Sequence, residues 1–125
     1  GIRVLELGGE RADYCGRLLA GAGAEVVKVE PPGGSYTRRF GPFYHDTPDP
    51  ERSLYFWHYN LGKRSVVLDL ESPEGRAAFE PLVRAADVIL DGYAPGEGLP
   101  IEVIRGINPR AIVCTITSFG PTGLG

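Results

Sequence analysis

The stretch GIRVLELGGERADYCGRLLAGAGAEVVKVEPPGG, residues 1–34, decides the fold. Residues 2–7 form an apolar run typical of a strand, and Gly8-Gly9 ends it. Residues 13–22 carry apolar side chains at helical spacing, and a glycine follows. A second strand is predicted at residues 24–30, where two prolines and two glycines end it. Strand, helix and strand within about 30 residues indicate a compact βαβ unit.

The same alternation resumes in the second half of the chain. Strands are predicted at residues 65–70, 87–91 and 111–116, and helices at 72–86 and 100–106. The first of these helices has a strong start, because the Ser72 hydroxyl can cap it, Pro73 fits its first turn and Glu74 faces the positive end of its dipole. Pro81 is expected to kink it. Strands alternating with helices predict the α/β class, with a Rossmann-like, mostly parallel sheet flanked by helices.

A long segment, residues 31–64, interrupts this rhythm and holds eight of the twelve aromatic residues. Loops of this length inside a compact domain are usually functional or disordered, and aromatic side chains argue against disorder. A short helix is predicted at residues 53–61 with Ser53 as its N-cap. We therefore expect this segment to be ordered by packing.

Composition places the chain among ordinary globular proteins. Its 125 residues fit one domain with a modest core, and the formal net charge of -3 argues against nucleic acid as a partner. No apolar run approaches the roughly 20 residues that span a bilayer, so no membrane segment is predicted. A cytoplasmic location is expected.

The cysteines and histidines predict no metal site. Cys15 and Cys114 lie among apolar neighbours, too few and too far apart for a disulfide framework, and both are predicted to be buried free thiols. His45 and His58 lack metal-ligand spacing and are interpreted as surface or packing residues.

Gly8-Gly9 after the first strand invites comparison with a dinucleotide site, in which Glu30 would bind a ribose. The glycine-rich fingerprint would need glycine where Glu10 and Asp13 stand, so a backbone approach to a pyrophosphate is not favoured. A tight strand-to-helix turn is the preferred interpretation, with a nicotinamide or flavin site as the weaker alternative.

Two basic pairs flank the aromatic segment. Arg38-Arg39 and Lys63-Arg64 are candidate phosphate contacts, since a guanidinium offers forked donors and an ammonium offers a point charge. Solvated surface is the alternative interpretation of both pairs.

Several blocks of sequence, in order and over nearly the whole chain, resemble the family III coenzyme A (CoA) transferases. This CaiB/BaiF group includes formyl-CoA and carnitine-CoA transferases and the α-methylacyl-CoA racemases. The matching blocks are residues 1–7, 18–34, 60–70, 72–75, 86–90, 93–96, 108–110 and 118–123.

The resemblance implies that residues 1–125 are part of a Rossmann-like CoA-binding domain, with 31–64 as an insertion and the rest of the family domain beyond residue 125. It implies acyl-CoA and a small carboxylic acid as substrates, no tightly bound cofactor, and an interlocked homodimer. By the same resemblance, the CoA-binding residues would be Arg11, Ala12, Leu68, Asp69, Leu70, Glu71, Gly92, Tyr93, Ala94, Thr117, Ser118, Phe119 and Gly120.

The chain also departs from the family pattern. Ala12-Asp13-Tyr14 stands where the family often has Ala-Gly-Pro, and Glu71 replaces a lysine found in some members. Residues 97–100 replace a longer segment and lack its basic residue.

The activity implied by the resemblance is transfer of CoA through an enzyme carboxylate. The carboxylate attacks the donor thioester to form a mixed anhydride, the CoA thiolate then gives an enzyme thioester, and the acceptor acid captures the CoA. The nucleophilic aspartate is expected beyond Gly125, so no catalytic residue is assigned. The alternatives are an α-methylacyl-CoA racemase or epimerase of the same family, and a non-catalytic nucleotide-binding or assembly fragment.

Overall fold

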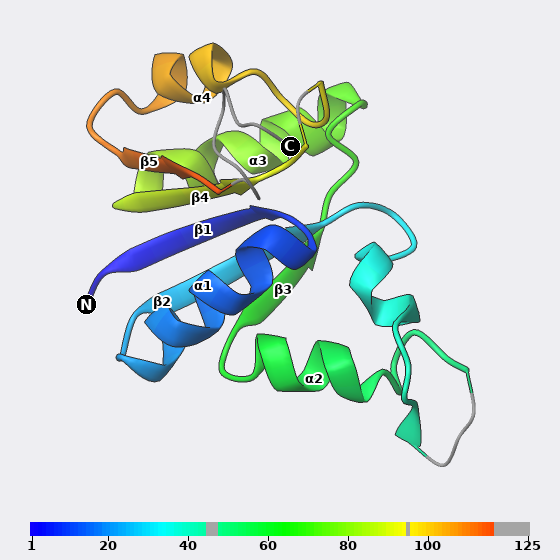
Figure 1. Cartoon of the computed structure of the whole chain (residues 1–125). Coiled ribbons are helices and arrows are strands. Elements are labelled where there is room, and N and C mark those ends of the chain that lie inside the picture. Colours follow the sequence, from blue (N-terminus) through cyan, green and yellow to red (C-terminus); the bar gives the residue numbers. More distant parts are fainter. Residues whose placement is uncertain (45–47, 95, 117–125) are drawn as a thin grey trace, which may run out of the picture.

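A computed structural model describes residues 1–44, 48–94 and 96–116, and its centre is a five-stranded sheet in which every pairing is parallel (Figure 1). The strand order is β3-β2-β1-β4-β5. The strands are β1 (Arg3–Gly8), β2 (Glu25–Glu30), β3 (Arg64–Val67), β4 (Val88–Gly92) and β5 (Ile112–Thr115); the α-helices are α1 (Glu10–Gly21), α2 (Leu54–Asn60), α3 (Pro73–Ala85) and α4 (Ile101–Ile107). The α/β class and the parallel sheet are confirmed.

Alternating side chains of the strands build a separate core on each face of the sheet. On one face, Leu5 and Leu7 pack with Phe79 and Val83 of α3, and Ile104 of α4 joins the same cluster. On the other face, a smaller cluster joins Val4, Val26 and Leu90 to Ala12 of α1. The sheet is therefore covered by helices on both sides.

The predicted helix starts have mixed outcomes. The Ser72 hydroxyl accepts the Gly75 amide, as predicted, and α3 continues through Pro81 to Ala85. Helix α1 begins at Glu10, three residues before the predicted start. The helical pattern was hidden there because Asp13 is buried and polar rather than apolar.

Strand β3 ends at Val67, three residues before the predicted end. Beyond it the chain turns: the Leu68 amide donates to the Glu30 carbonyl, and the Ser72 amide donates to the Asp69 carbonyl. This turn connects β3 to α3 at the carboxyl edge of the sheet.

The aromatic segment is built on short helices in its described parts. A 3-10 helix, η1 (Tyr36–Arg39), precedes α2, and the Ser53 hydroxyl accepts the Phe56 amide as the predicted N-cap. Ring contacts tie the segment to α1, with the Tyr14 and Tyr59 centroids 6.4 Å apart. The packing expected of this segment is thus present.

The two cysteines differ. Cys15 is partly buried, and burial raises the pKa of its thiol. Cys114 is exposed, so the prediction of a buried thiol is wrong there. Its strand, β5, is at the edge of the sheet, where side chains receive less cover than in the central strands.

No helix in the described part of the chain is long and apolar enough to cross a membrane.

Candidate functional site

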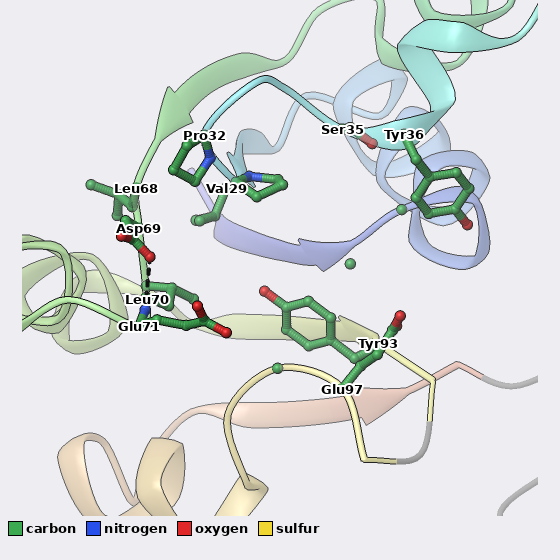
Figure 2. A pocket seen from close by; sticks show the side chains of 14 residues that line it. Val29, Pro32, Ser35, Tyr36, Leu68, Asp69, Leu70, Glu71, Tyr93 and Glu97 are labelled. Atoms are coloured by element: carbon green, nitrogen blue, oxygen red, sulfur yellow. Dashed lines mark hydrogen bonds between the residues drawn. The ribbon is translucent and has the colours of Figure 1, made fainter.

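A cavity of about 390 Å³ opens at the carboxyl edge of the sheet (Figure 2). It lies beside the ends of β1 and β4, where the strand order reverses, the usual place for a ligand in an open α/β sheet. Its lining residues are Gly8, Gly9, Val29, Pro31, Pro32, Ser35, Tyr36, Leu68, Asp69, Leu70, Glu71, Tyr93, Glu97 and Gly98.

Two glycines form the turn at the end of β1. Gly8 has a φ of 91°, and a Cβ there would lie 2.5 Å from the carbonyl carbon of Gly92. A Cβ on Gly9 would lie 2.3 Å from the ring of Tyr36. Both positions therefore need glycine, because β4 and the Tyr36 ring come too close for a side chain. The predicted tight strand-to-helix turn is present.

Tyr36 forms one side of the cavity. Its hydroxyl oxygen accepts the Glu10 amide at 3.1 Å, at the start of α1. Figure 2 shows Tyr36 and the turn of residues 68–71 on opposite sides of the cavity. The aromatic segment and the β3–α3 connection thus provide facing walls.

The turn after β3 contributes apolar and acidic groups. Leu68, Asp69, Leu70 and Glu71 all line the cavity. The Asp69 carboxylate accepts the Glu71 amide at 3.0 Å, which orders the turn. The carboxylates of Asp69 and Glu71 are both on exposed residues.

Tyr93, just after β4, lies between these walls. Its amide donates to Asp91 at 3.1 Å, and the Ala94 amide donates to Glu97 at 2.8 Å. A Cβ on Gly98 would lie 2.3 Å from the Tyr93 ring, so the following loop packs closely on that ring. Burial, reinforced by the charge of Asp91, raises the pKa of Tyr93. Its phenol is therefore a neutral hydrogen-bonding group at physiological pH.

Glu30 holds the segment that follows β2. The Arg38 guanidinium donates to both of its carboxylate oxygens, at 2.7 and 2.9 Å, and lies 3.9 Å from the ring centre of Phe56. Burial raises the pKa of Glu30, but the hydrogen bonds from Arg38 and from the Ser35 amide outweigh it and leave the pKa below its usual value. Glu30 is only 1% exposed, so it is not placed to bind a ribose.

The four basic residues predicted to contact phosphate have different surroundings. Arg38 is paired with Glu30, and the Lys63 ammonium lies 2.6 Å from Glu6 with its side chain 1% exposed. Arg64 begins β3, away from the carboxyl edge, and Arg39 is exposed. None of the four lines the cavity. Their phosphate contacts stay a prediction.

A buried cluster of charges beneath α1 was missed from the sequence. The Lys28 ammonium lies 2.6 Å from Asp13 and 2.9 Å from Glu6, and all three side chains are 0% exposed. Burial raises the pKa of Glu6, and the nearby Lys28 and Lys63 offset only part of that rise. Burial lowers the pKa of Lys28, but Glu6 and Asp13 reverse this and leave it raised. The detectable signal was a charge in each of two apolar strands, at positions that pair in register, Glu6 with Lys28.

The cluster reaches the cavity through the backbone. The Lys28 ammonium also donates to the carbonyl of Gly8 at 3.3 Å, and Lys63 donates to the Asp13 carbonyl at 2.8 Å. These bonds connect the buried charges to the turn at the end of β1 and to α1.

The residues predicted to bind CoA fall into three groups. Five of them line the cavity: Leu68, Asp69, Leu70, Glu71 and Tyr93. Ala12 and Gly92 are buried against one another behind it, Ala94 adjoins Tyr93, and Arg11 is exposed on the first turn of α1. Thr117, Ser118, Phe119 and Gly120 lie outside the described residues, as does His45. Val29, Pro31 and Pro32 also line the cavity. From the sequence these residues were predicted only to mark the end of a strand.

Metal chemistry has no candidate centre in residues 1–44, 48–94 and 96–116, where no three His, Cys, Asp or Glu side chains are grouped to hold an ion.

Comparisons with known proteins agree along the whole chain. A family model described as CoA-transferase family III matches residues 1–124. A succinate–glutarate CoA-transferase of Agrobacterium fabrum is 44% identical over 131 residues, which cover 98% of this chain and 33% of that protein. The succinyl-CoA:(R)-benzylsuccinate CoA-transferase subunit BbsE of Thauera aromatica is 38% identical over 126 residues, covering 98% of this chain and 31% of that subunit.

A solved structure supports the same relationship. A CAIB/BAIF family protein from Brucella suis matches with a TM-score of 0.83 at 40% sequence identity, over 98% of this chain and 34% of that protein. The chain therefore spans about a third of the length of the curated relatives it matches.

Proposed function

This chain belongs to CoA-transferase family III, and from that premise we propose that the whole protein moves CoA from an acyl-CoA thioester to a free carboxylic acid. In this proposal, residues 1–125 contribute part of the CoA site. The single observation that carries it is the cavity at the carboxyl edge, lined by five of the residues that the family resemblance assigns to CoA.

The cavity has surfaces suited to the nucleoside end of CoA. The ring of Tyr93 and the side chains of Val29, Pro32 and Leu68 offer apolar contact to a flat base. Carboxylates and backbone groups beside them can hydrogen-bond to amino and hydroxyl groups. A mostly apolar pocket with a few polar groups is the usual composition of a small-molecule site.

We propose the transfer chemistry as a covalent relay. An enzyme carboxylate attacks the thioester carbonyl and expels the CoA thiolate, leaving a mixed acyl anhydride. The thiolate attacks the enzyme carbonyl of this anhydride and releases the donor acid, and the acceptor carboxylate then repeats the two steps in reverse. Splitting the exchange keeps each step a simple substitution, and exclusion of water protects the intermediates. The carboxylate is assigned to no residue of this chain.

A dicarboxylic acid is the proposed acceptor class. The two curated relatives described above carry two dicarboxylic acids each in their names: succinate and glutarate in one, and the succinyl group of succinyl-CoA and benzylsuccinate in the other. Both are also named transferases, so the racemase alternative is not favoured.

A homodimer in the cytoplasm completes the proposal. Several large apolar side chains remain exposed on and beside α1 and α2: Tyr14, Leu18, Leu54, Trp57 and Leu61. Such a surface is suited to contact with another chain. The two free cysteines, one of them exposed, suit a reducing compartment. Light scattering of the purified protein tests the dimer, and a monomeric mass would contradict it.

The binding part of the proposal is tested by calorimetric titration of the protein with CoA. We expect saturable binding that Tyr93→Ala weakens at least about fivefold, because the ring loses its contact with the base. Tyr44→Ala is the matched control, since Tyr44 is an exposed tyrosine outside the cavity and outside the apolar surface proposed for the dimer. Absence of binding, or equal losses in the two variants when both are folded, would refute the site.

The chemical part is tested by incubating the full-length protein with succinyl-CoA and a panel of small carboxylic acids, with mass spectrometry of the products. New acyl-CoA esters that form only with an acceptor support transfer. Exchange of the α-proton with deuterated water in the absence of any acceptor would instead indicate a racemase.

A further inference from the structure

The cavity is acidic where a phosphorylated ligand would need cations. Asp69, Glu71 and Glu97 line it, and among its described lining residues none is lysine or arginine. Opposite charge favours binding of an anion, and like charge opposes it. The negative charge of the lining therefore favours entry of an uncharged part of a ligand over a phosphorylated part.

The buried and half-buried cations near this edge are already paired, and the exposed Arg76 donates to the Leu70 carbonyl. Arg38 donates to both oxygens of Glu30, and Lys28 lies between Asp13 and Glu6. Lys63 is paired with Glu6 as well. Removing a buried cation from its carboxylate would leave an uncompensated charge, which is strongly unfavourable. These side chains are thus held away from the cavity.

The start of α1 is also occupied. In open α/β sheets the N-terminus of the helix after β1 is a common place for a phosphate. Here the Glu10 amide donates to the Tyr36 hydroxyl, and the amides of Ala12 and Asp13 donate to the Gly9 carbonyl. The neighbouring side chains of Glu10 and Arg11 carry opposite charges, so they do not add a net positive charge to this turn. The engaged backbone donors are what disfavours a phosphate there.

Of the three carboxylates, Glu71 is the one least restrained. Asp69 accepts the Glu71 amide, and Glu97 accepts the Ala94 amide. Within the described part of the chain, no hydrogen bond or ion pair engages the Glu71 carboxylate. Figure 2 shows this side chain extending toward the space beside Tyr93.

We infer that this cavity takes the uncharged, nucleoside-like end of its ligand and selects against a phosphate on the ribose, with Glu71 as the specificity-determining residue. The inference rests on the proposed function, since it concerns how the same cavity divides the parts of CoA. Carboxylates at the rim accept hydrogen bonds from ribose hydroxyl or base amino groups. The phosphates lie outside the cavity.

The test compares CoA with dephospho-CoA, which lacks only the phosphate on the ribose. Titration of the full protein at low salt is expected to show dephospho-CoA binding about threefold to tenfold more tightly, as for a like charge several ångströms away in a partly exposed site. The ratio should approach one as salt is raised, because exposed charges are screened.

Two variants assign the effect. Glu71→Gln is expected to remove most of the preference, and Glu71→Lys to reverse it in favour of CoA. Glu74→Gln, with the same loss of charge three residues away and outside the cavity lining, should leave the preference unchanged.

The outcomes separate this inference from the proposed function. If CoA binds more tightly than dephospho-CoA in the wild type, and Glu71→Gln changes nothing, charge selection is refuted and the CoA site stands. An equal effect of Glu74→Gln would refute the assignment to Glu71. If neither ligand binds, the proposed function fails and the inference fails with it.

Discussion

The chain places acidic side chains in two contrasting regions. Beneath α1, Glu6 and Asp13 are fully buried and are matched by Lys28 and Lys63. At the cavity, Asp69 and Glu71 are exposed and no lysine or arginine is among the described lining residues. The comparison teaches that the interior carboxylates are neutralised by paired cations and support the turn after β1, whereas the rim carboxylates are solvent-exposed and have no lysine or arginine beside them among the described lining residues.

The largest effect is expected from unbalancing the interior. Lys28→Met leaves Glu6 and Asp13 buried without their shared cation, which should destabilise the protein by about 3–5 kcal/mol. Urea unfolding followed by circular dichroism measures this loss. Arg84→Met is the control, because it breaks an exposed pair with Glu80 and should change stability by less than about 1 kcal/mol. Similar losses of stability in Lys28→Met and Arg84→Met would contradict the view that the buried charges matter more for stability than the exposed ones.

A smaller effect is expected at the pair of Glu30 and Arg38, which holds the segment after β2. Glu30→Gln weakens charge-assisted hydrogen bonds from Arg38 and should reduce stability at neutral pH by about 1.5–3 kcal/mol.

The pH dependence of the same variant has a definite sign. The pKa of Glu30 is lowered in the folded protein, so the unfolded chain binds its proton more readily. The contribution of Glu30 is therefore complete above its ordinary pKa of 4.5 and is lost as the pH falls from there through the lowered value. Unfolding free energies measured from pH 7 to pH 3 should converge for wild type and variant; a constant difference would contradict the assignment.

A still smaller loss of stability is expected at the start of α3, next to the cavity wall formed by residues 68–71. Ser72→Ala removes the cap of α3, whose hydroxyl accepts the Gly75 amide at 3.0 Å, and should cost about 1 kcal/mol. Ser72→Asn, another good cap, should restore most of the loss in a thermal unfolding experiment. If Ser72→Asn does not restore the stability, capping of α3 is not the main contribution of the Ser72 hydroxyl.

The smallest effect on stability is expected at the rim itself. Glu71→Gln should change the free energy of unfolding by less than about 0.5 kcal/mol, because the carboxylate is exposed. Urea unfolding of Glu71→Gln and Lys28→Met under the same conditions compares the two free energies of unfolding directly. A large loss at Glu71 would mean that rim and interior are not distinct.

Much of the fold could be predicted because its signals are local. Apolar runs predicted the strands, and the capping hydroxyls of Ser53 and Ser72 predicted where two helices begin. The position of the cavity was also predictable, since parallel strands place their carboxyl ends at one edge.

The failures were of a different kind. Lys28 is buried because β2 pairs with β1 and brings Lys28 next to Glu6. Lys63 is buried against the same Glu6, which lies far from it in sequence. Neither contact can be read from local sequence. Cys114 was predicted to be buried from its apolar neighbours, but its exposure follows from the place of β5 at the sheet edge. Residues 68–71 and Tyr93 were assigned from a family resemblance and not from physical pattern; they line the cavity, and their contact with CoA stays a prediction.

The contact of Tyr36 with Gly9 places one wall of the cavity on the segment between β2 and β3, outside the sheet itself. The same segment supplies Arg38 to Glu30 of β2 and Lys63 to Glu6 of β1. A transplanted segment would therefore have to keep these two cations in order to leave the sheet undisturbed, while Tyr36 could be varied to reshape the wall.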